Sequence, residues 1–218
     1  MIVTKAKPLE EISQALGPLK KIFIIGCGDC AATCRTGGEK EVLEMKGLLE
    51  KEGRVVIGWA VPDSACIASQ IKMCFAKNKK AMDDTEAILV LSCGLGVQSV
   101  IDNDRRKRPV YIGCDTMFGS VVDATGLGFF EKCAMCGDCV LNVTAGICPV
   151  SRCAKGLLNG PCGGSNKGKC EVDKDKDCAW ILIYNRLKEL KMLDNLRRIK
   201  PAKDHSKANR PREIILKE

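Results

Sequence analysis

The chain has 218 residues, enough for one ordinary hydrophobic core and a smaller module, so we expect two domains. It contains 15 cysteines but a single histidine, His205, in a polar basic tail. Ser-His-Asp hydrolysis, HExxH metalloproteolysis and mixed Cys/His zinc fingers each lose a residue that they require. Aromatic residues make up only 4% of the chain, which is poor material for nucleic-acid binding by base stacking.

The formal net charge of +8 counts every cysteine as neutral. Because a [4Fe-4S] cluster with four thiolate ligands carries a net charge of about −2, three clusters would reduce the charge to about +2. The first residues show no apolar h-region and no small-residue cleavage site, and nowhere do about 18 apolar residues follow one another. We therefore expect a soluble cytoplasmic protein without membrane insertion, in which thiols bind metal rather than form disulfides.

Strands and helices are predicted to alternate in the first part of the chain. Residues 21–25 form an apolar, β-branched run that is typical of a buried parallel strand. Further strands are expected at 54–59, 87–91 and 109–112, and helices at 8–16, 38–52, 64–77 and 97–104. This order indicates βαβ units and a flavodoxin-like, doubly wound parallel sheet over residues 1–128.

Most cysteines of this part lie just past a predicted strand, where such sheets bind their ligands. Six of the seven cysteines before residue 130 do so, namely Cys27, Cys30, Cys34, Cys66, Cys93 and Cys114. The exception, Cys74, lies within a predicted helix and is expected to be a buried core thiol.

The loop G-C-G-D-C-A-A-T-C occupies the position where a nucleotide-binding fold keeps its phosphate loop. A G-x-G-x-x-G fingerprint is expected in such a fold, but here Gly26 and Gly28 flank a thiol, Cys27, where a small residue is needed, which leaves dinucleotide binding the weaker hypothesis. We expect Cys27, Cys30 and Cys34 to hold a [4Fe-4S] cluster, with zinc or a reactive thiol as the alternative. Cys93, in a glycine-rich turn, is the favoured fourth ligand, followed by Cys66 and then Cys114, because a flavodoxin-like strand order places the first strand between the second and third.

Eight further cysteines are concentrated in the second part of the chain, at Cys133, Cys136, Cys139, Cys148, Cys153, Cys162, Cys170 and Cys178. The first three are spaced by two residues, and Cys148-Pro149 repeats the Cys-Pro ending of bacterial ferredoxin ligand runs. Eight thiols make two sets of four, so we expect two more clusters in a loop-rich, ferredoxin-like module over residues 129–200. Which thiols belong together stays open. Glycines interrupt every periodic pattern here, so the module should fold only with its metal.

The connecting and terminal segments carry weaker signals. Residues 116–131 are expected to be a connector, with the domain boundary near residue 128. After Cys178 an amphipathic helix is predicted to run to about residue 199. Residues 201–218 are expected to be a flexible basic tail; the alternative is an arm that becomes ordered on a partner, since residues 214–216 are apolar.

Four stretches of the chain point to a known family. They are G-I-C-P-V-S-R-C-A-K-G-L-L-N-G-P-C-G-G-S at 146–165, G-K-C-E-V-D at 168–173, C-A-W-I-L-I-Y-N-R-L at 178–187 and S-C-G-L-G-V-Q at 92–98. The chain resembles the methylenetetrahydrofolate reductase C-terminal domain family, in particular the small iron-sulfur subunit of the two-subunit reductase of acetogenic bacteria. The resemblance extends to about residue 196.

This resemblance implies a subunit that is not catalytic alone. In that family a separate flavin-bearing barrel subunit reduces 5,10-methylenetetrahydrofolate to 5-methyltetrahydrofolate. The resemblance therefore implies electron transfer to the FMN of such a partner in the one-carbon (Wood-Ljungdahl) pathway, with ferredoxin or another carrier as the donor.

Two alternatives stay open. Zinc is also associated with the C-terminal cysteines of the family, so the chain can be read as a zinc-binding structural adaptor with no redox role there. A corrinoid or thiol-transfer enzyme with Cys66 or Cys114 as nucleophile is the third reading.

Overall fold

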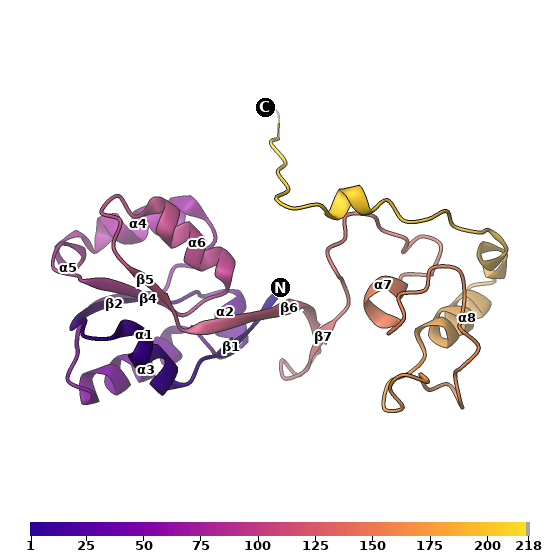
Figure 1. Ribbon diagram of the computed structural model, residues 1–218, viewed down its shortest axis with the longest axis horizontal. Helices are drawn as coiled ribbons and strands as arrows, with labels where there is room; N and C mark the ends of the chain where they lie inside the picture. Colours follow the sequence, from indigo (N-terminus) through magenta and orange to yellow (C-terminus); the bar gives the residue numbers. More distant parts are fainter. Residues whose placement is uncertain (217–218) are drawn as a thin grey trace. The chain divides into compact units, whose positions relative to one another are not determined.

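The chain divides into two compact units, residues 1–118 and 119–218. In this computed structural model (Figure 1) the described residues are 1–216. The boundary expected near residue 128 falls within the second unit. None of the helices in the described part of the chain has the length and apolar character needed to span a bilayer.

A parallel four-stranded sheet in the order β3-β2-β4-β5 forms the centre of the first unit. Its strands are β2 (Lys21–Ile25), β3 (Val55–Ala60), β4 (Ala87–Val90) and β5 (Val110–Ile112). β2 pairs in parallel with both β3 and β4, and β4 pairs with β5. The predicted strands are confirmed, and so is the expectation that the first of them lies between the second and third.

Alternate residues of the central strands enter two cores, one on each face of the sheet. Phe23 and Ile25 of β2 pack in one core, and Ile22 and Ile24 pack in the other. Because all four side chains are fully buried, β2 is apolar throughout, as expected for a strand that helices cover on both faces.

Helices cover each face of this sheet. α4 and α6 lie on the face of Phe23, and α1 and α3 lie on the opposite face (Figure 1). The helices are α1 (Leu9–Leu16), α2 (Cys30–Thr33), α3 (Glu39–Lys51), α4 (Ala68–Lys77), α5 (Lys79–Asp83) and α6 (Gly94–Asn103). α6 begins three residues earlier than predicted, because Cys93 takes the extended N-cap conformation and the amide of Gly94 donates to Thr116 Oγ1 at 2.8 Å. α4 begins later than predicted, at Ala68.

A second sheet replaces the connector expected at residues 116–131, so that prediction is wrong. Its strand order is β1-β6-β7, with β1 (Ile2–Ala6), β6 (Cys114–Val122) and β7 (Phe129–Glu131). β6 and β7 form an antiparallel hairpin that pairs Val121 with Phe130. Only Cys114 and Gly119 of β6 are buried, and its exposed residues do not alternate with buried ones. An exposed strand shows no alternation of apolar and polar residues, which is the signal from which strands are predicted.

The second unit is mostly loop, with short helices. These are α7 (Pro149–Arg152), α8 (Ala179–Glu189) and the 3₁₀ helices η1 (Leu193–Arg197) and η2 (His205–Ala208). α8 buries Trp180, Ile183 and Leu187 in a small core with Ile147 and Leu157.

The helix predicted to reach residue 199 ends at Glu189. Lys191 adopts a left-handed conformation with φ of 57°, and the amide of Met192 donates back to the carbonyl of Leu187 at 2.8 Å. This is the hydrogen bond of a Schellman cap, where glycine is the usual residue. A lysine at that position gives no stop signal in the sequence.

Candidate metal centres

Six thiols of the first unit gather at the carboxyl edge of the parallel sheet. Cys27 follows β2, Cys30 begins α2 and Cys34 follows it, while Cys93 caps α6 beyond β4. Cys66 precedes α4, and Cys114 begins β6. Cys27, Cys93 and Cys114 are buried, Cys30 and Cys34 are half-buried, and Cys66 is exposed. Cys74, within α4, is buried in the core, as expected.

Two glycines let the loops at this edge pack closely. A Cβ atom on Gly37 would lie 1.8 Å from the carbonyl oxygen of Leu91, and one on Gly26 would lie 2.3 Å from the carbonyl oxygen of Gly37. Neither position accepts a side chain without moving the backbone. The loop that carries Cys27 is thereby held against the end of β4, two residues before Cys93.

The thiols are near enough to influence one another's ionisation. Burial raises the pKa of Cys114 to about 12, and the neighbouring thiols of Cys34 and Cys93 add to the shift. Although Cys66 is exposed as a residue, desolvation of its thiol raises its pKa, and Cys93 and Cys27 raise it further. Cys93 therefore influences the ionisation of both other candidates for fourth ligand, Cys66 and Cys114.

An N-terminal strand that sequence analysis did not predict closes this site. The amide of Ile2, in β1, donates to the sulfur of Cys30 at 3.4 Å, and the thiol of Cys34 donates to the carbonyl of Ile2 at 3.8 Å. Burial raises the pKa of Cys30, and the hydrogen bond from the Ile2 amide, which favours the thiolate, offsets only part of that shift.

Four thiols of the second unit line one small hollow. They are Cys153, Cys162, Cys170 and Cys178, and they share the lining with Arg152, Lys155, Glu171 and Trp180. The amide of Gly164 donates to the sulfur of Cys162 at 3.5 Å, and this bond, with the nearby charge of Lys155, lowers the pKa of that thiol. Lys155 also forms an ion pair with Glu171.

The loop from Cys133 to Cys139 is held by the C-terminal segment. The amide of Met135 donates to the sulfur of Cys133 at 3.3 Å. The ammonium of Lys203 donates to the carbonyl of Asp138 at 2.6 Å, and the Lys203 side chain is only 7% exposed. Backbone hydrogen bonding at Asp138 lowers the pKa of Cys136, and Lys203 lowers it further.

Two more contacts tie the same segment to this loop. Lys207 pairs with the carboxylate of Asp138 at 3.3 Å, and Arg212 donates to the carbonyl of Met135 at 2.8 Å. The flexible tail expected here is therefore not observed over residues 203–212. Residues 214–216 are exposed and apolar, as expected, and residues 217–218 lie outside the described part of the chain.

The donor set fits metal groups that bind through thiolates. Every candidate ligand is a soft sulfur donor, and several accept amide hydrogen bonds or lie beside lysines, which suits an iron-sulfur cluster or zinc. The single histidine is exposed in η2 and takes no part. Within residues 1–216, no three Cys, His, Asp or Glu side chains already stand where they would hold one metal ion.

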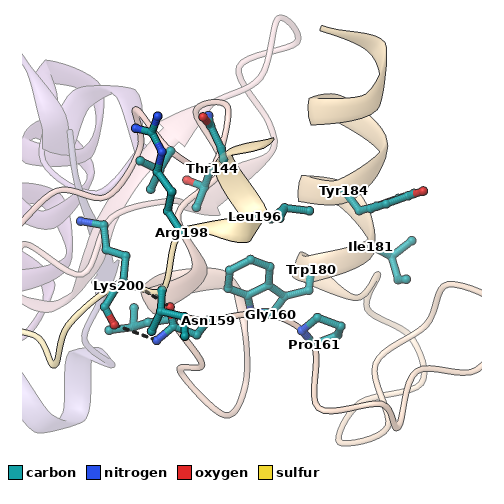
Figure 2. Close-up of a pocket in the computed structure, with 14 residues that line it drawn as sticks. Thr144, Asn159, Gly160, Pro161, Trp180, Ile181, Tyr184, Leu196, Arg198 and Lys200 are labelled. Atoms are coloured by element: carbon teal, nitrogen blue, oxygen red, sulfur yellow. Dashed lines mark hydrogen bonds between the residues drawn. The ribbon is translucent and has the colours of Figure 1, made fainter. Parts of the chain in front are cut away.

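An apolar groove with a volume of about 500 Å³ lies beside the thiol hollow, and Trp180 lines both. Figure 2 shows Trp180, Ile181 and Tyr184 of α8 on one side and Leu196 and Arg198 on the other. Asn159 and the backbone of Lys200 exchange two hydrogen bonds, of 3.0 and 2.7 Å, at its end. No carboxylate, thiol or imidazole is present among the described residues that line the groove.

Residues 111–206 match the family described as Methylene-tetrahydrofolate reductase C terminal. The matched segment contains all eight cysteines from Cys133 to Cys178, together with the segment around Lys203. Neither a curated protein nor a solved structure matches the chain significantly.

Proposed function

We propose that the chain is the electron-transfer subunit of a two-subunit reductase, because residues 111–206 match the methylenetetrahydrofolate reductase C-terminal family, in agreement with the resemblance. A flavin-bearing partner reduces 5,10-methylenetetrahydrofolate to 5-methyltetrahydrofolate, and this chain delivers the electrons. The four thiols around one hollow inside the matched segment are the observation that carries the proposal. We further propose that the first unit is flavodoxin-like and the second ferredoxin-like.

The proposed ligands fall in both units. Cys27, Cys30, Cys34 and Cys93 hold one [4Fe-4S] cluster, and two more are held by Cys133, Cys136, Cys139, Cys148, Cys153, Cys162, Cys170 and Cys178. When bound, such clusters supply electrons one at a time, two of which with two protons reduce one FMN of the partner. The chain's own amides and lysines support the thiolate form of its cysteines, as at Cys162 and Cys136. Ferredoxin or a similar carrier is the proposed donor.

The ionisation of the thiols argues against the reading as a thiol-transfer enzyme. A nucleophilic cysteine needs a lowered pKa, and burial raises the pKa of Cys114 to about 12 and also raises that of Cys66.

The test is reduction of the partner's flavin. The chain is purified without oxygen, reduced with dithionite, freed of excess reductant and mixed with the oxidised flavoprotein. We expect the flavin absorbance near 450 nm to bleach on a scale of seconds or faster, and the Cys162→Ser variant to be much slower. Cys74→Ala is the control, since Cys74 is a core thiol apart from the proposed ligands, and its transfer rate should match the parent chain.

Two results would overturn the proposal. One is full transfer by a chain whose second unit carries zinc, which would favour the structural adaptor. The other is reduction of methylenetetrahydrofolate by the isolated chain, which would make it an enzyme in its own right.

A further inference from the structure

We infer that Cys153, Cys162, Cys170 and Cys178 hold one metal group and that Cys133, Cys136, Cys139 and Cys148 hold another. This rests on the proposed function, in which the second unit binds metal through its eight cysteines. The sequence leaves many ways to divide eight thiols, and the fold of the unit favours this one.

Four of the eight thiols line a single hollow. All four thiols of the first set border the same hollow. Among the described residues, none of the other four cysteines is part of that lining. Four sulfur donors around one space form a complete ligand set for either a tetrahedral ion or a cubane cluster.

A hairpin explains why Cys170 and Cys178 meet although seven residues separate them. An antiparallel bridge joins Lys169 to Asp177, the residues immediately before these two cysteines. The amide of Cys170 donates to the carbonyl of Lys176 at 2.9 Å, and the amide of Cys178 donates to the carbonyl of Gly168 at 2.8 Å. The backbone thus places both cysteines on one face of the hairpin as diagonal neighbours, Cys170 on the turn side of the bridge and Cys178 on its open side.

The other two thiols reach the same hollow from neighbouring elements. Cys153 ends α7 and Cys178 precedes α8, and both pack against the core of Trp180, Ile183 and Leu187. Cys162 lies in a glycine turn, where Gly163 has a φ of 83° and the next amide donates to the cysteine sulfur.

Cys148 is assigned to the other set because it does not line this hollow. Cys148 caps the N-terminus of α7 and Cys153 caps its C-terminus. A four-residue helix holds its two caps about 7 Å apart along the axis and on different turns. In two-cluster ferredoxins the thiol of the Cys-Pro pair binds a different cluster from the three cysteines before it. In the division proposed here, Cys148 instead binds the same metal group as Cys133, Cys136 and Cys139.

Non-additive loss of metal in the full chain tests this division. Single Cys→Ser variants at 153, 162, 170 and 178 should each lose one metal group, and the double variant Cys162→Ser/Cys170→Ser should lose no more than either single variant. Cys136→Ser/Cys162→Ser should lose two groups. The readouts are iron, sulfide and zinc per chain together with the EPR spectrum of the reduced protein, and the group of the first unit serves as an internal standard. The division is overturned if the double variant at 162 and 170 loses two groups, or if the one at 136 and 162 loses only one.

A second measurement on the unmodified chain remains decisive if a variant fails to fold. Metal is released stepwise with chelator or mild oxidant, and freed thiols are alkylated and identified by mass spectrometry. Cys153, Cys162, Cys170 and Cys178 should become reactive together. Simultaneous labelling of Cys148 with Cys162 would contradict the division. A chain purified with no metal would defeat the proposed function as well, whereas metal shared in another pattern would defeat the division alone.

Discussion

At the scale of single residues, Lys203 fastens the loop that carries three proposed ligands. Its ammonium contacts both the carbonyl and the carboxylate of Asp138, at 2.6 and 3.7 Å, with a side chain that is 7% exposed. Lys207 pairs with the same carboxylate but is half-exposed, at 50%. Buried ionic hydrogen bonds contribute more to stability than solvent-exposed ion pairs. Lys203 should therefore stabilise this loop more than Lys207 does.

Replacing Lys203 should therefore loosen the metal group at Cys136. For Lys203→Met, which keeps the apolar stem, we expect metal release to chelator to be about tenfold faster. Lys207→Met should change the rate less than about twofold. The measurement is the rate of absorbance loss with excess chelator, and equal rates for the two variants would contradict the role given to Lys203.

A second residue-scale prediction concerns Asp104 at the end of α6. Its side chain is 2% exposed and accepts hydrogen bonds from the side chain and amide of Arg108 and from the amide of Arg106. Burial by itself would raise the pKa of Asp104, but the hydrogen bonds from Arg108 outweigh it and the pKa is lowered. A lowered pKa means that the carboxylate adds stability above its ordinary pKa of about 3.9 and that this is lost as pH falls through the folded value.

Asp104→Asn should thus destabilise the first unit in a pH-dependent way. We expect a loss of about 2–3 kcal/mol in the free energy of unfolding near pH 7, because Arg108 keeps its hydrogen bond to the Met82 carbonyl but loses its carboxylate partner. The difference in unfolding free energy between the parent chain and the variant should stay constant down to about pH 5 and become smaller below about pH 4. Hydrogen exchange of amides in β2 and β4 measures this difference in unfolding free energy. A difference that grows in acid would contradict the role given to Asp104.

At the scale of elements, the close passage of two loops positions the thiols at the sheet edge. Gly37→Ala would drive a methyl group into the Leu91 carbonyl, 1.8 Å away, and should cost about 3 kcal/mol or more. Gly47→Ala is the matched control, since it lies within α3 and a Cβ there meets nothing within 4 Å. It should stabilise the unit by about 0.5–1 kcal/mol. Denaturant unfolding measures both, and a mild effect of Gly37→Ala would show that the loops need not touch.

Elements whose burial produces a regular pattern of apolar residues could be predicted from the sequence. The strands around Phe23 and Leu89 were predictable because helices cover both faces, and the thiols at their carboxyl ends followed from topology. β1 and β6 carry little burial and gave no pattern, and the end of α8 depends on a left-handed lysine, Lys191. The grouping of the C-terminal thiols depends on a hairpin held by backbone hydrogen bonds. Such bonds do not require particular residue types, so the sequence does not predict them.

At the scale of the whole molecule, the two units differ in what stabilises them. The parallel sheet has a core on each face, whereas the second unit has one small cluster around Trp180, Ile183 and Leu187. A loop-rich segment with so little buried apolar surface cannot offset its conformational entropy by packing alone. Metal binding has to supply the remaining free energy.

Removing the metal should therefore unfold one unit and spare the other. After chelation under reducing conditions we expect amides of residues 133–178 to exchange at least about a hundredfold faster, while those in β2 and β4 change little. Hydrogen exchange with mass spectrometry measures both in one sample. Retained protection at Cys170 and Cys178 after complete metal loss would mean that the hairpin folds by itself.

The central claim is that this chain carries electrons through thiolate-bound clusters to a flavoprotein. Iron, sulfide and zinc analysis of the anaerobically purified full chain, with EPR of the reduced protein, tests it most directly. Three cubane clusters predict about 12 iron and about 12 sulfide per chain and no zinc. About 4 iron with one or two zinc per chain would contradict the three-cluster relay.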